Sequence, residues 1–186
     1  MTVQASTRTQ LRTDFVASLK ALPAVITDSS ALFVTLSGLS QARLRKDWKA
    51  GTKTTSCNSF AGWCGREAGA PGGSTLATGK LDLSRCDNEV PGSWVWANTG
   101  EAIDAHLMPQ PGDFYSKPFP GQTWGHVGIV TDVDPVGMRW ELMQGGQGGP
   151  TLGYDKIERK WFKFDRAAIN GWVDLGVYLL PEMADA

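Results

Sequence analysis

The chain has 186 residues, of which 41% are hydrophobic and 20% charged, so it is long enough for one compact domain and too apolar for a disordered segment. Its 18 basic and 19 acidic residues leave a net charge of -1, which gives no electrostatic reason to expect nucleic acid or an anionic membrane as a partner. The longest apolar runs, such as residues 31–34 and 177–180, fall far short of the roughly 20 residues that cross a bilayer, so no membrane span is expected.

The first fifty residues are predicted to be mainly helical. Large apolar side chains recur at helical spacing in residues 9–22, and Pro23 ends this pattern. A second helix is predicted over residues 29–48, with Gly38 as its weak point. The amino terminus lacks the apolar stretch of a secretory signal, so export by the general secretory route is not expected.

Residues 54–69 are predicted to form a helix with Cys57 in its first turn. The segment opens with hydroxyl side chains, which cap helices, and closes with a glycine after a charged turn. Unpaired N–H groups at a helix start lower the pKa of a thiol, and they can also stabilise the oxyanion that forms when a thiolate attacks a carbonyl. Cys57 is therefore the candidate nucleophile. Cys64 lies two turns later on the same helix face and is predicted to be a core residue.

The three cysteines are too few, and odd in number, for a disulfide framework, so at least one free thiol is expected. A disulfide between Cys64 and Cys86 stays open. Cys57 and Cys64 lie farther apart than the paired ligands of a zinc knuckle, so a metal site is not predicted.

Loops are predicted over residues 70–100, which are rich in glycine, proline and small polar side chains, around a short apolar patch at residues 94–96. A helix-like stretch over residues 98–108 comes next. The sequence PQPGD, residues 109–113, ends it and leads into a short strand.

A β-hairpin is predicted from residues 125–133 and 138–144, because two apolar, β-favouring runs flank the turn-forming sequence DPVG. The glycine-rich residues 145–150 are predicted to form a tight loop after the hairpin. Residues 160–166 and 172–180 are predicted to supply two further strands.

A cysteine nucleophile needs a base, and the chain has only two histidines. His126 is preferred because it opens a predicted strand, which holds an imidazole more rigidly than the helix-like stretch around His106. The base must itself be oriented by an acceptor, which the second strand of the hairpin can deliver. Glu141 and Gln144 are the polar candidates there.

Three blocks in order resemble the papain-like peptidoglycan hydrolases, which include the NlpC-type and CHAP-type domains. Residues 56–60 (SCNSF) resemble the nucleophile helix of that family, residues 109–113 (PQPGD) its strand entry, and residues 125–130 (GHVGIV) its histidine strand. The resemblance covers roughly residues 57–148. Many members have an acidic residue before the nucleophile and a glycine after the following serine, and this chain departs from that pattern.

The resemblance implies an α+β, papain-like fold, with N-terminal helices and the nucleophile helix packed on a central antiparallel β-sheet. It implies one catalytic domain over residues 1–186, with a helical extension at 1–50 and a papain-like core at 51–180. The third catalytic position falls by register on Gln144, while Glu141 on the opposite strand face remains an alternative.

The resemblance also implies a cysteine peptidase or amidase that cleaves an amide of the peptidoglycan stem peptide, at the sugar-to-L-alanine bond or a D-glutamyl-to-diamino-acid bond. Cys57 is then the nucleophile and His126 the base, and no cofactor is needed. Ser56, Asn58 and Trp124 are the candidate substrate-binding residues. The alternatives are a papain-like protease or deamidase acting on a protein, and a binding module that kept the fold without activity.

A wall hydrolase without a secretory signal must reach its substrate by another route. Members of the resembling family do so as phage lysis enzymes, or as antibacterial effectors that a type VI secretion apparatus injects into a target periplasm. The compact catalytic domain, without a wall-binding repeat, favours the effector, held in the cytoplasm before release. An effector of this kind implies an immunity protein that covers the cleft.

Overall fold

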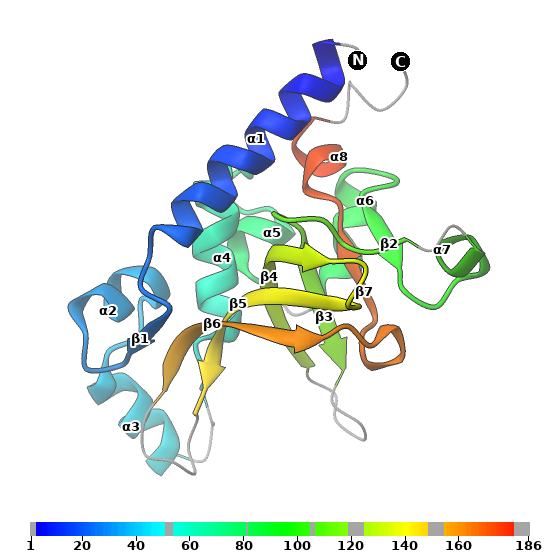
Figure 1. Cartoon of the computed structure of the whole chain (residues 1–186). Helices are drawn as coiled ribbons and strands as arrows, with labels where there is room; N and C mark the ends of the chain where they lie inside the picture. The colour runs from blue at the N-terminus through cyan, green and yellow to red at the C-terminus, as the bar shows by residue number, and fades with distance from the viewer. Residues whose placement is uncertain are drawn as a thin grey trace.

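A computed structural model of the chain describes residues 3–50, 54–80, 82–104, 107–118, 125–148 and 155–180. The strands are β1 (Val25–Thr27), β2 (Trp94–Trp96), β3 (Phe114–Pro118), β4 (Gly125–Asp134), β5 (Arg139–Gln147), β6 (Lys156–Lys163) and β7 (Gly171–Val173). They form a seven-stranded sheet in the order β1-β6-β5-β4-β3-β7-β2, and each neighbouring pair is antiparallel (Figure 1). Mixed helices and an antiparallel sheet make this an α+β fold.

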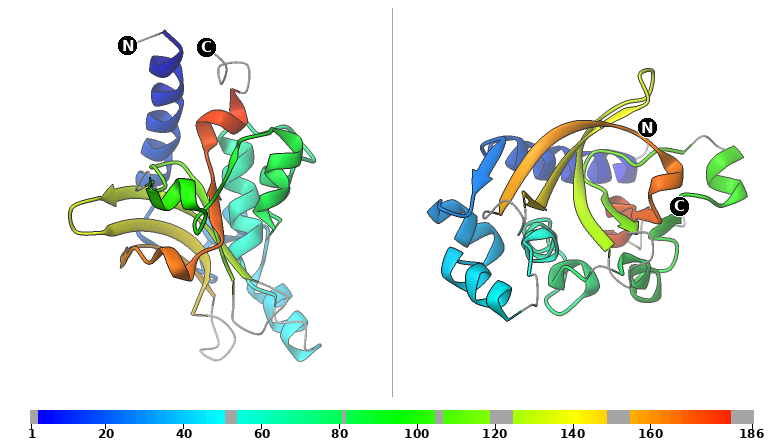
Figure 2. Two further views of the ribbon diagram at one scale, coloured as in Figure 1. Left: turned by 90° about the vertical axis from the view of Figure 1, so that its right-hand side faces the viewer. Right: turned by 90° about the horizontal axis from the view of Figure 1, so that it is seen from below.

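The helices of the described residues are α1 (Val3–Lys20), α2 (Ala31–Ser37), α3 (Gln41–Lys49), α4 (Cys57–Glu67), α5 (Thr75–Thr78), α6 (Cys86–Glu89), α7 (Gly100–Asp104) and α8 (Leu175–Leu179), with 3-10 turns η1 (Leu83–Arg85) and η3 (Arg166–Ala168). Seen from the side in Figure 2, α4 and α5 lie on one side of the sheet, and the β4–β5 hairpin projects on the other. Helices α4 and α5 therefore cover one face of the sheet.

The helix predicted over residues 29–48 is two helices, α2 and α3. Gly38 adopts a left-handed φ of 66°, and its N–H bonds to the carbonyl of Val34, which ends α2. The N-terminal segment also supplies β1, which pairs with the edge of β6. Phe15 and Leu19 of α1 are buried in the main core, so the described part of this segment packs into the same structure as the sheet.

Helix α4 packs tightly between α5 and the sheet. Phe60 and Cys64 are fully buried in a core that includes residues of β4 and β5. A Cβ at Gly65 would lie 2.4 Å from the carbonyl oxygen of Leu76 in α5, so this crossing has no room for a side chain. The glycines of α4 therefore set how closely α5 approaches the helix that begins with Cys57.

The prediction of loops over residues 70–100 is only partly correct. Short helical turns, α5, η1 and α6, interrupt the loops of this segment, and Leu76, Leu83 and Cys86 are buried. The Glu89 carboxylate accepts hydrogen bonds from the N–H and hydroxyl of Thr75, at 2.9 Å and 2.7 Å. Helices of three or four residues are too short to show a hydrophobic period, and caps of this kind hold them instead.

The predicted hairpin is present as β4 and β5, with Gly137 N–H bonded to the carboxylate of Asp134 in the turn. The tight loop predicted at residues 145–150 is wrong for residues 145–147, which continue β5 after an irregularity in its pairing with β6. Residues 149 and 150 lie outside the described residues.

At the carboxyl end, β6 confirms one predicted strand, whereas residues 172–180 form the strand β7 followed by helix α8. Asp174 caps α8 by accepting the N–H of Val177. Arg12 of α1 bonds to Asp174 at 2.6 Å and to Asp113 at 2.5 Å. The buried aspartate of the PQPGD sequence thus joins α1 to the entry of β3 and to α8.

The two faces of the central strands have different surroundings. Alternation along β4 and β5 places Val127, Ile129 and Met143 in the core under α4. The opposite face carries a second, smaller cluster that includes Tyr115 and Trp140. Side chains of β4 and β5 on that second face lead to the candidate site.

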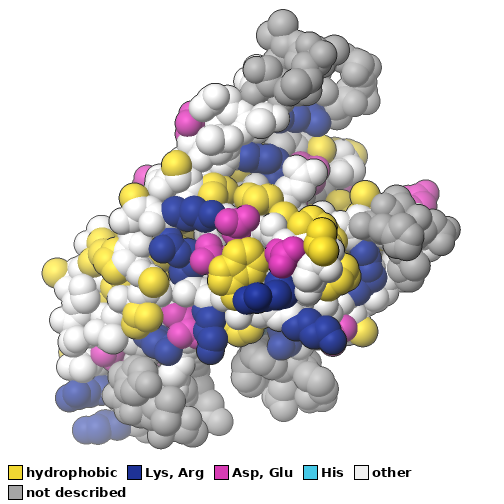
Figure 3. Space-filling view, viewed as in Figure 1, with side chains coloured by type: hydrophobic (Ala, Val, Ile, Leu, Met, Phe, Trp, Pro, Cys, Tyr) yellow, Lys and Arg dark blue, Asp and Glu magenta, His cyan; other side chains and the backbone are white. Residues whose placement is uncertain are grey.

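On the surface seen in Figure 3, basic and acidic side chains are mixed rather than separated by sign, in keeping with the net charge of -1. Ion pairs such as Lys156–Glu158, at 2.6 Å, contribute to this mixture. In the part of the chain that the structure describes, no helix has the length and apolar character that crossing a bilayer requires.

Candidate active site

Cys57 is the first residue of α4 and is 6% exposed. The preceding Ser56 donates from its N–H and its hydroxyl to the carboxylate of Asp155, both at 3.0 Å. The same hydroxyl accepts the N–H of Gly146 at 2.7 Å. Asp155 precedes β6 and Gly146 lies near the end of β5, so these bonds fix the helix start against two strand ends.

Two glycines let β5 pass close to the helix start. A Cβ at Gly145 would lie 2.6 Å from the Ser56 hydroxyl oxygen and 2.7 Å from the Ser56 carbonyl oxygen. Gly146 has a φ of +74°, and a Cβ there would lie 3.5 Å from the Cβ of Cys57. The glycine-rich sequence thus follows from the close approach of two backbones beside Cys57.

We predict that Gly145→Ala lowers the free energy of unfolding by about 1–3 kcal/mol, because the added methyl group meets the backbone of Ser56. A shift of that backbone would also displace the adjoining Cys57. Urea denaturation measures the change in the free energy of unfolding. Gly72→Ala is the matched control, since a Cβ at Gly72 meets no atom within 4 Å. Equal stability of the two variants would contradict the packing described.

The electrostatic setting of Cys57 differs from the sequence expectation. Burial raises the pKa of this thiol, and a contribution from Asp155 acts in the same direction. Hydrogen bonding from Thr55, 3.4 Å from the sulfur, and from the backbone of Asn58 and Val127 lowers the pKa but does not outweigh burial. The expected lowering of the pKa at the helix start is therefore wrong in net direction, because desolvation is the larger effect.

A raised pKa means less thiolate at neutral pH, so alkylation of Cys57 by iodoacetamide should accelerate about tenfold per pH unit below that pKa. Mass spectrometry of the labelled peptide between pH 6 and 9 measures the rate. Cys64 and Cys86 are internal controls, both 0% exposed, and we expect them to stay unlabelled in the folded protein. A labelling rate that does not change between pH 6 and 8 would indicate a stable thiolate and contradict the raised pKa of Cys57.

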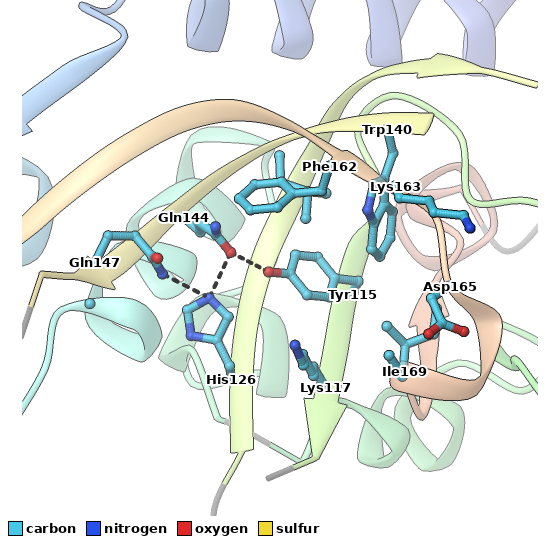
Figure 4. A pocket seen from close by; sticks show the side chains of 13 residues that line it. Tyr115, Lys117, His126, Trp140, Gln144, Gln147, Phe162, Lys163, Asp165 and Ile169 are labelled. Atoms are coloured by element: carbon cyan, nitrogen blue, oxygen red, sulfur yellow. Dashed lines mark hydrogen bonds between the residues drawn. The ribbon is translucent and has the colours of Figure 1, made fainter. Parts of the chain in front are cut away.

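His126 lies near the start of β4, is 9% exposed and points toward Gln144 of β5 (Figure 4). Its Nε2 is 2.8 Å from the Gln144 Oε1, and the Gln147 amide lies farther from the same nitrogen, at 3.4 Å. The Cys57 thiol lies beside the same strand, because the backbone of Val127, the next residue, is close enough to lower the pKa of that thiol. The structure thus places Gln144 against His126, and the Cys57 thiol beside the residue that follows His126.

Tyr115 of β3 fixes the orientation of Gln144. Its hydroxyl donates to the Gln144 Oε1 at 2.5 Å, and its ring lies edge-on to His126. Burial raises the pKa of Tyr115, so the hydroxyl keeps its proton and acts as donor. Since Gln144 Oε1 is then an acceptor, Nε2 of His126 carries a proton, and Nδ1 is the nitrogen that can take one from a thiol.

Burial lowers the pKa of His126, the Gln144 hydrogen bond raises it, and the charge of Lys117 lowers it further. Lys117 sits directly opposite His126 in the β3–β4 pairing, so the two side chains leave the sheet on the same face. With a lowered imidazole pKa and a raised thiol pKa, the resting pair is neutral.

Glu141, the alternative partner for His126, is engaged elsewhere. Its carboxylate accepts the hydroxyl of Thr131 at 2.8 Å and lies 3.8 Å from Arg159. Pairing with β4 places it opposite Asp132, away from the histidine end of that strand. This geometry favours Gln144 over Glu141.

The predicted substrate-binding residues have different settings. Ser56 is fully buried, with its hydroxyl bonded to Asp155 and Gly146, so it is not presented to a ligand. Asn58 is exposed, and its side chain accepts the N–H of Ser59. Trp124 lies outside the described residues, as does His106. All three cysteines are free, so the Cys64–Cys86 disulfide is not formed.

Sequence reasoning missed three residues of this site, Asp155, Tyr115 and Lys117. Asp155 lies 98 positions after Cys57 and no local pattern links them. Tyr115 and Lys117 do carry a signal, since they alternate along the short strand after PQPGD and therefore share a face. Once β3 is paired with β4, that face is the one that holds His126.

A pocket of about 330 Å³ opens beside His126 on this face of the sheet (Figure 4). Tyr115, Trp140, Leu142 and Phe162 give it apolar walls, and His126 lies at one end. A buried helix-start cysteine, a strand histidine held by an amide, and an adjoining pocket together define a candidate enzyme site.

The family comparison supports a hydrolase. The model of the CHAP domain matches residues 47–145, just over half of the chain, and the chain belongs to the CHAP-domain family. CHAP domains are typically hydrolases that act on peptidoglycan. No curated protein and no solved structure matches the chain at a significant level.

Proposed function

We propose that this CHAP domain is a papain-like cysteine amidohydrolase that cleaves an amide bond of the peptidoglycan stem peptide. The observation that carries the proposal is the bond between His126 Nε2 and Gln144 Oε1, on the strand whose Val127 backbone meets Cys57. In this proposal, Nδ1 of His126 is the nitrogen that acts on the thiol. Membership of the CHAP family supports peptidoglycan as the substrate class.

In the proposed cycle, Nδ1 of His126 accepts the thiol proton as the Cys57 sulfur forms a bond to the amide carbonyl carbon. The oxyanion forms beside the N–H groups of the first turn of α4. The carbon–nitrogen bond then breaks, and His126 returns the proton to the leaving amine. Water attacks the resulting thioester, giving a proton to His126, and the free acid leaves as the thiol is restored.

Gln144 acts in this cycle as a neutral orienting group. Its amide oxygen holds the histidine ring but stabilises an imidazolium less than a carboxylate does. This agrees with a resting pair in which both the thiol and the imidazole are neutral. The proton then moves only as the carbonyl is attacked.

Incubation with purified peptidoglycan tests the proposal. The wild type should release soluble fragments whose masses identify one cleaved amide, either sugar-to-L-alanine or D-glutamyl-to-diamino-acid. Parallel incubation with an unfolded protein, such as casein, tests for a protease, and mass analysis of glutamine side chains tests for a deamidase. If no wall preparation yields fragments while a protein substrate is cleaved or deamidated, the wall-hydrolase proposal fails.

We further propose that the protein acts as an antibacterial effector that reaches the target periplasm and is neutralised by an immunity protein over the site. Expression in bacteria with and without a periplasmic targeting signal checks the location of the target. We expect the cells to lyse only when the protein carries the periplasmic targeting signal. Equal toxicity from the cytoplasm would point to a protein target instead.

A further inference from the structure

The pocket beside His126 has an uneven distribution of charge. Lys117 is half-buried and lies between His126 and Ile169 in Figure 4, while Lys163 and Asp165 lie at the other end. The Asp165 carboxylate accepts the N–H of Ala167. The histidine end therefore carries a cation, and the far end carries charges of both signs.

Among the described residues, no carboxylate pairs with Lys117, although other lysines, such as Lys20 and Lys156, form ion pairs at 2.6 Å. Its charge is close enough to His126 to lower the pKa of that imidazole. A cation beside a catalytic base disfavours the imidazolium that the reaction forms. A partly buried lysine that opposes the base, and that has no anionic partner within the described parts of the chain, is well placed to bind an anion of the substrate.

We propose that this pocket binds a substrate residue that carries a free carboxylate next to the cleaved amide, and that Lys117 recognises the carboxylate. The inference rests on the proposed amidohydrolase function and adds the charge of the substrate to it. The apolar walls from Trp140, Phe162 and Tyr115 pack against the aliphatic part of that residue. A bound carboxylate also offsets the effect of Lys117 on His126, so the correct substrate makes the base more effective.

Paired stem peptides that differ only at this group test the inference. One peptide carries a glutamyl residue with a free α-carboxylate, and the other carries the carboxamide of the same shape. The wild type should cleave the acid with about tenfold higher kcat/KM than the amide, the size of a charge-assisted hydrogen bond. Lys117→Met should reduce this ratio to about one, and Lys117→Arg should keep most of it.

Lys46→Met in α3 is the matched control, because it removes one exposed charge that does not line the pocket, and it should keep the wild-type ratio. A ratio that is the same in the wild type and Lys117→Met overturns the inference and leaves the proposed function standing. Dissociation constants on a Cys57→Ala background separate binding from turnover. On that background the acid should bind about tenfold more tightly than the amide, and the preference should vanish when Lys117→Met is added. A binding preference that persists in Lys117→Met overturns the inference. Failure to cleave either peptide, by contrast, defeats the proposed function, and the binding comparison still tests the inference in that case.

Discussion

Replacement of Cys57 by alanine is expected to lower amide cleavage by at least about ten-thousandfold, to the background of the assay. The sulfur forms the covalent bond to the carbonyl carbon in the proposed cycle, and no other cysteine can take its place. Cys64 and Cys86 are both 0% exposed in the core. Loss of a covalent nucleophile removes the whole catalytic route rather than one contribution to it.

Cys64→Ala serves as the matched control for this loss. It removes a thiol from the same helix, two turns away, and leaves the helix start untouched. Thermal unfolding of both variants establishes that they are folded at the assay temperature. A Cys57→Ala protein that releases wall fragments at a rate within tenfold of the wild type would contradict the role of this thiol.

Replacement of His126 by alanine should lower kcat by about a thousandfold, within the range of general acid–base catalysis. Because burial raises the pKa of Cys57, the thiol depends on the imidazole for its deprotonation. The variant should regain part of its activity at alkaline pH, where hydroxide supplies the missing base. Release of wall fragments from pH 6 to 10 gives the profile.

His106→Ala is the comparison, since it removes the other histidine of the chain and is expected to keep wild-type activity. The lowered pKa of His126 means that the wild type stays active below pH 6.5, where an unperturbed histidine is largely protonated. Wild-type activity of His126→Ala at pH 7, or loss of activity in His106→Ala, would contradict the assignment of His126 as the base.

The elements that hold the chemistry were accessible from local sequence patterns. The hydroxyl residues before Cys57 predict a helix start there, and the turn between residues 133 and 138 predicts the hairpin that sets Gln144 opposite the histidine strand. Both signals depend on residues close in the chain. The placement of Gln144 rather than Glu141 at the histidine follows from alternation along β5.

The remaining features depend on contacts between distant parts of the chain. A three-residue strand such as β1 is recognisable only through its pairing with β6, more than 120 positions later. Asp155 meets Ser56 for the same reason. Residues 175–179 are apolar enough to be predicted as a strand. They form a helix whose first turn is capped by Asp174, and this cap is visible only in the structure.

The sequence also favoured a thiolate at Cys57, because a helix start is visible in a sequence whereas the degree of burial is not. The helix start supplies N–H donors, but its contacts with β5 exclude water from the sulfur. Removal of water raises the pKa of the thiol more than the donors lower it. In the proposed cycle, the thiol is therefore ionised only during the reaction.

Hydroxylamine trapping tests the central claim, a thioester on Cys57, most directly. When the stem peptide is cleaved in the presence of hydroxylamine, water and this stronger nucleophile compete to attack the thioester. The account predicts that mass spectrometry finds the acyl hydroxamate beside the free acid with the wild type, and neither product with Cys57→Ala. Cleavage that gives only the free acid at every hydroxylamine concentration, and proceeds equally in Cys57→Ala, would contradict it.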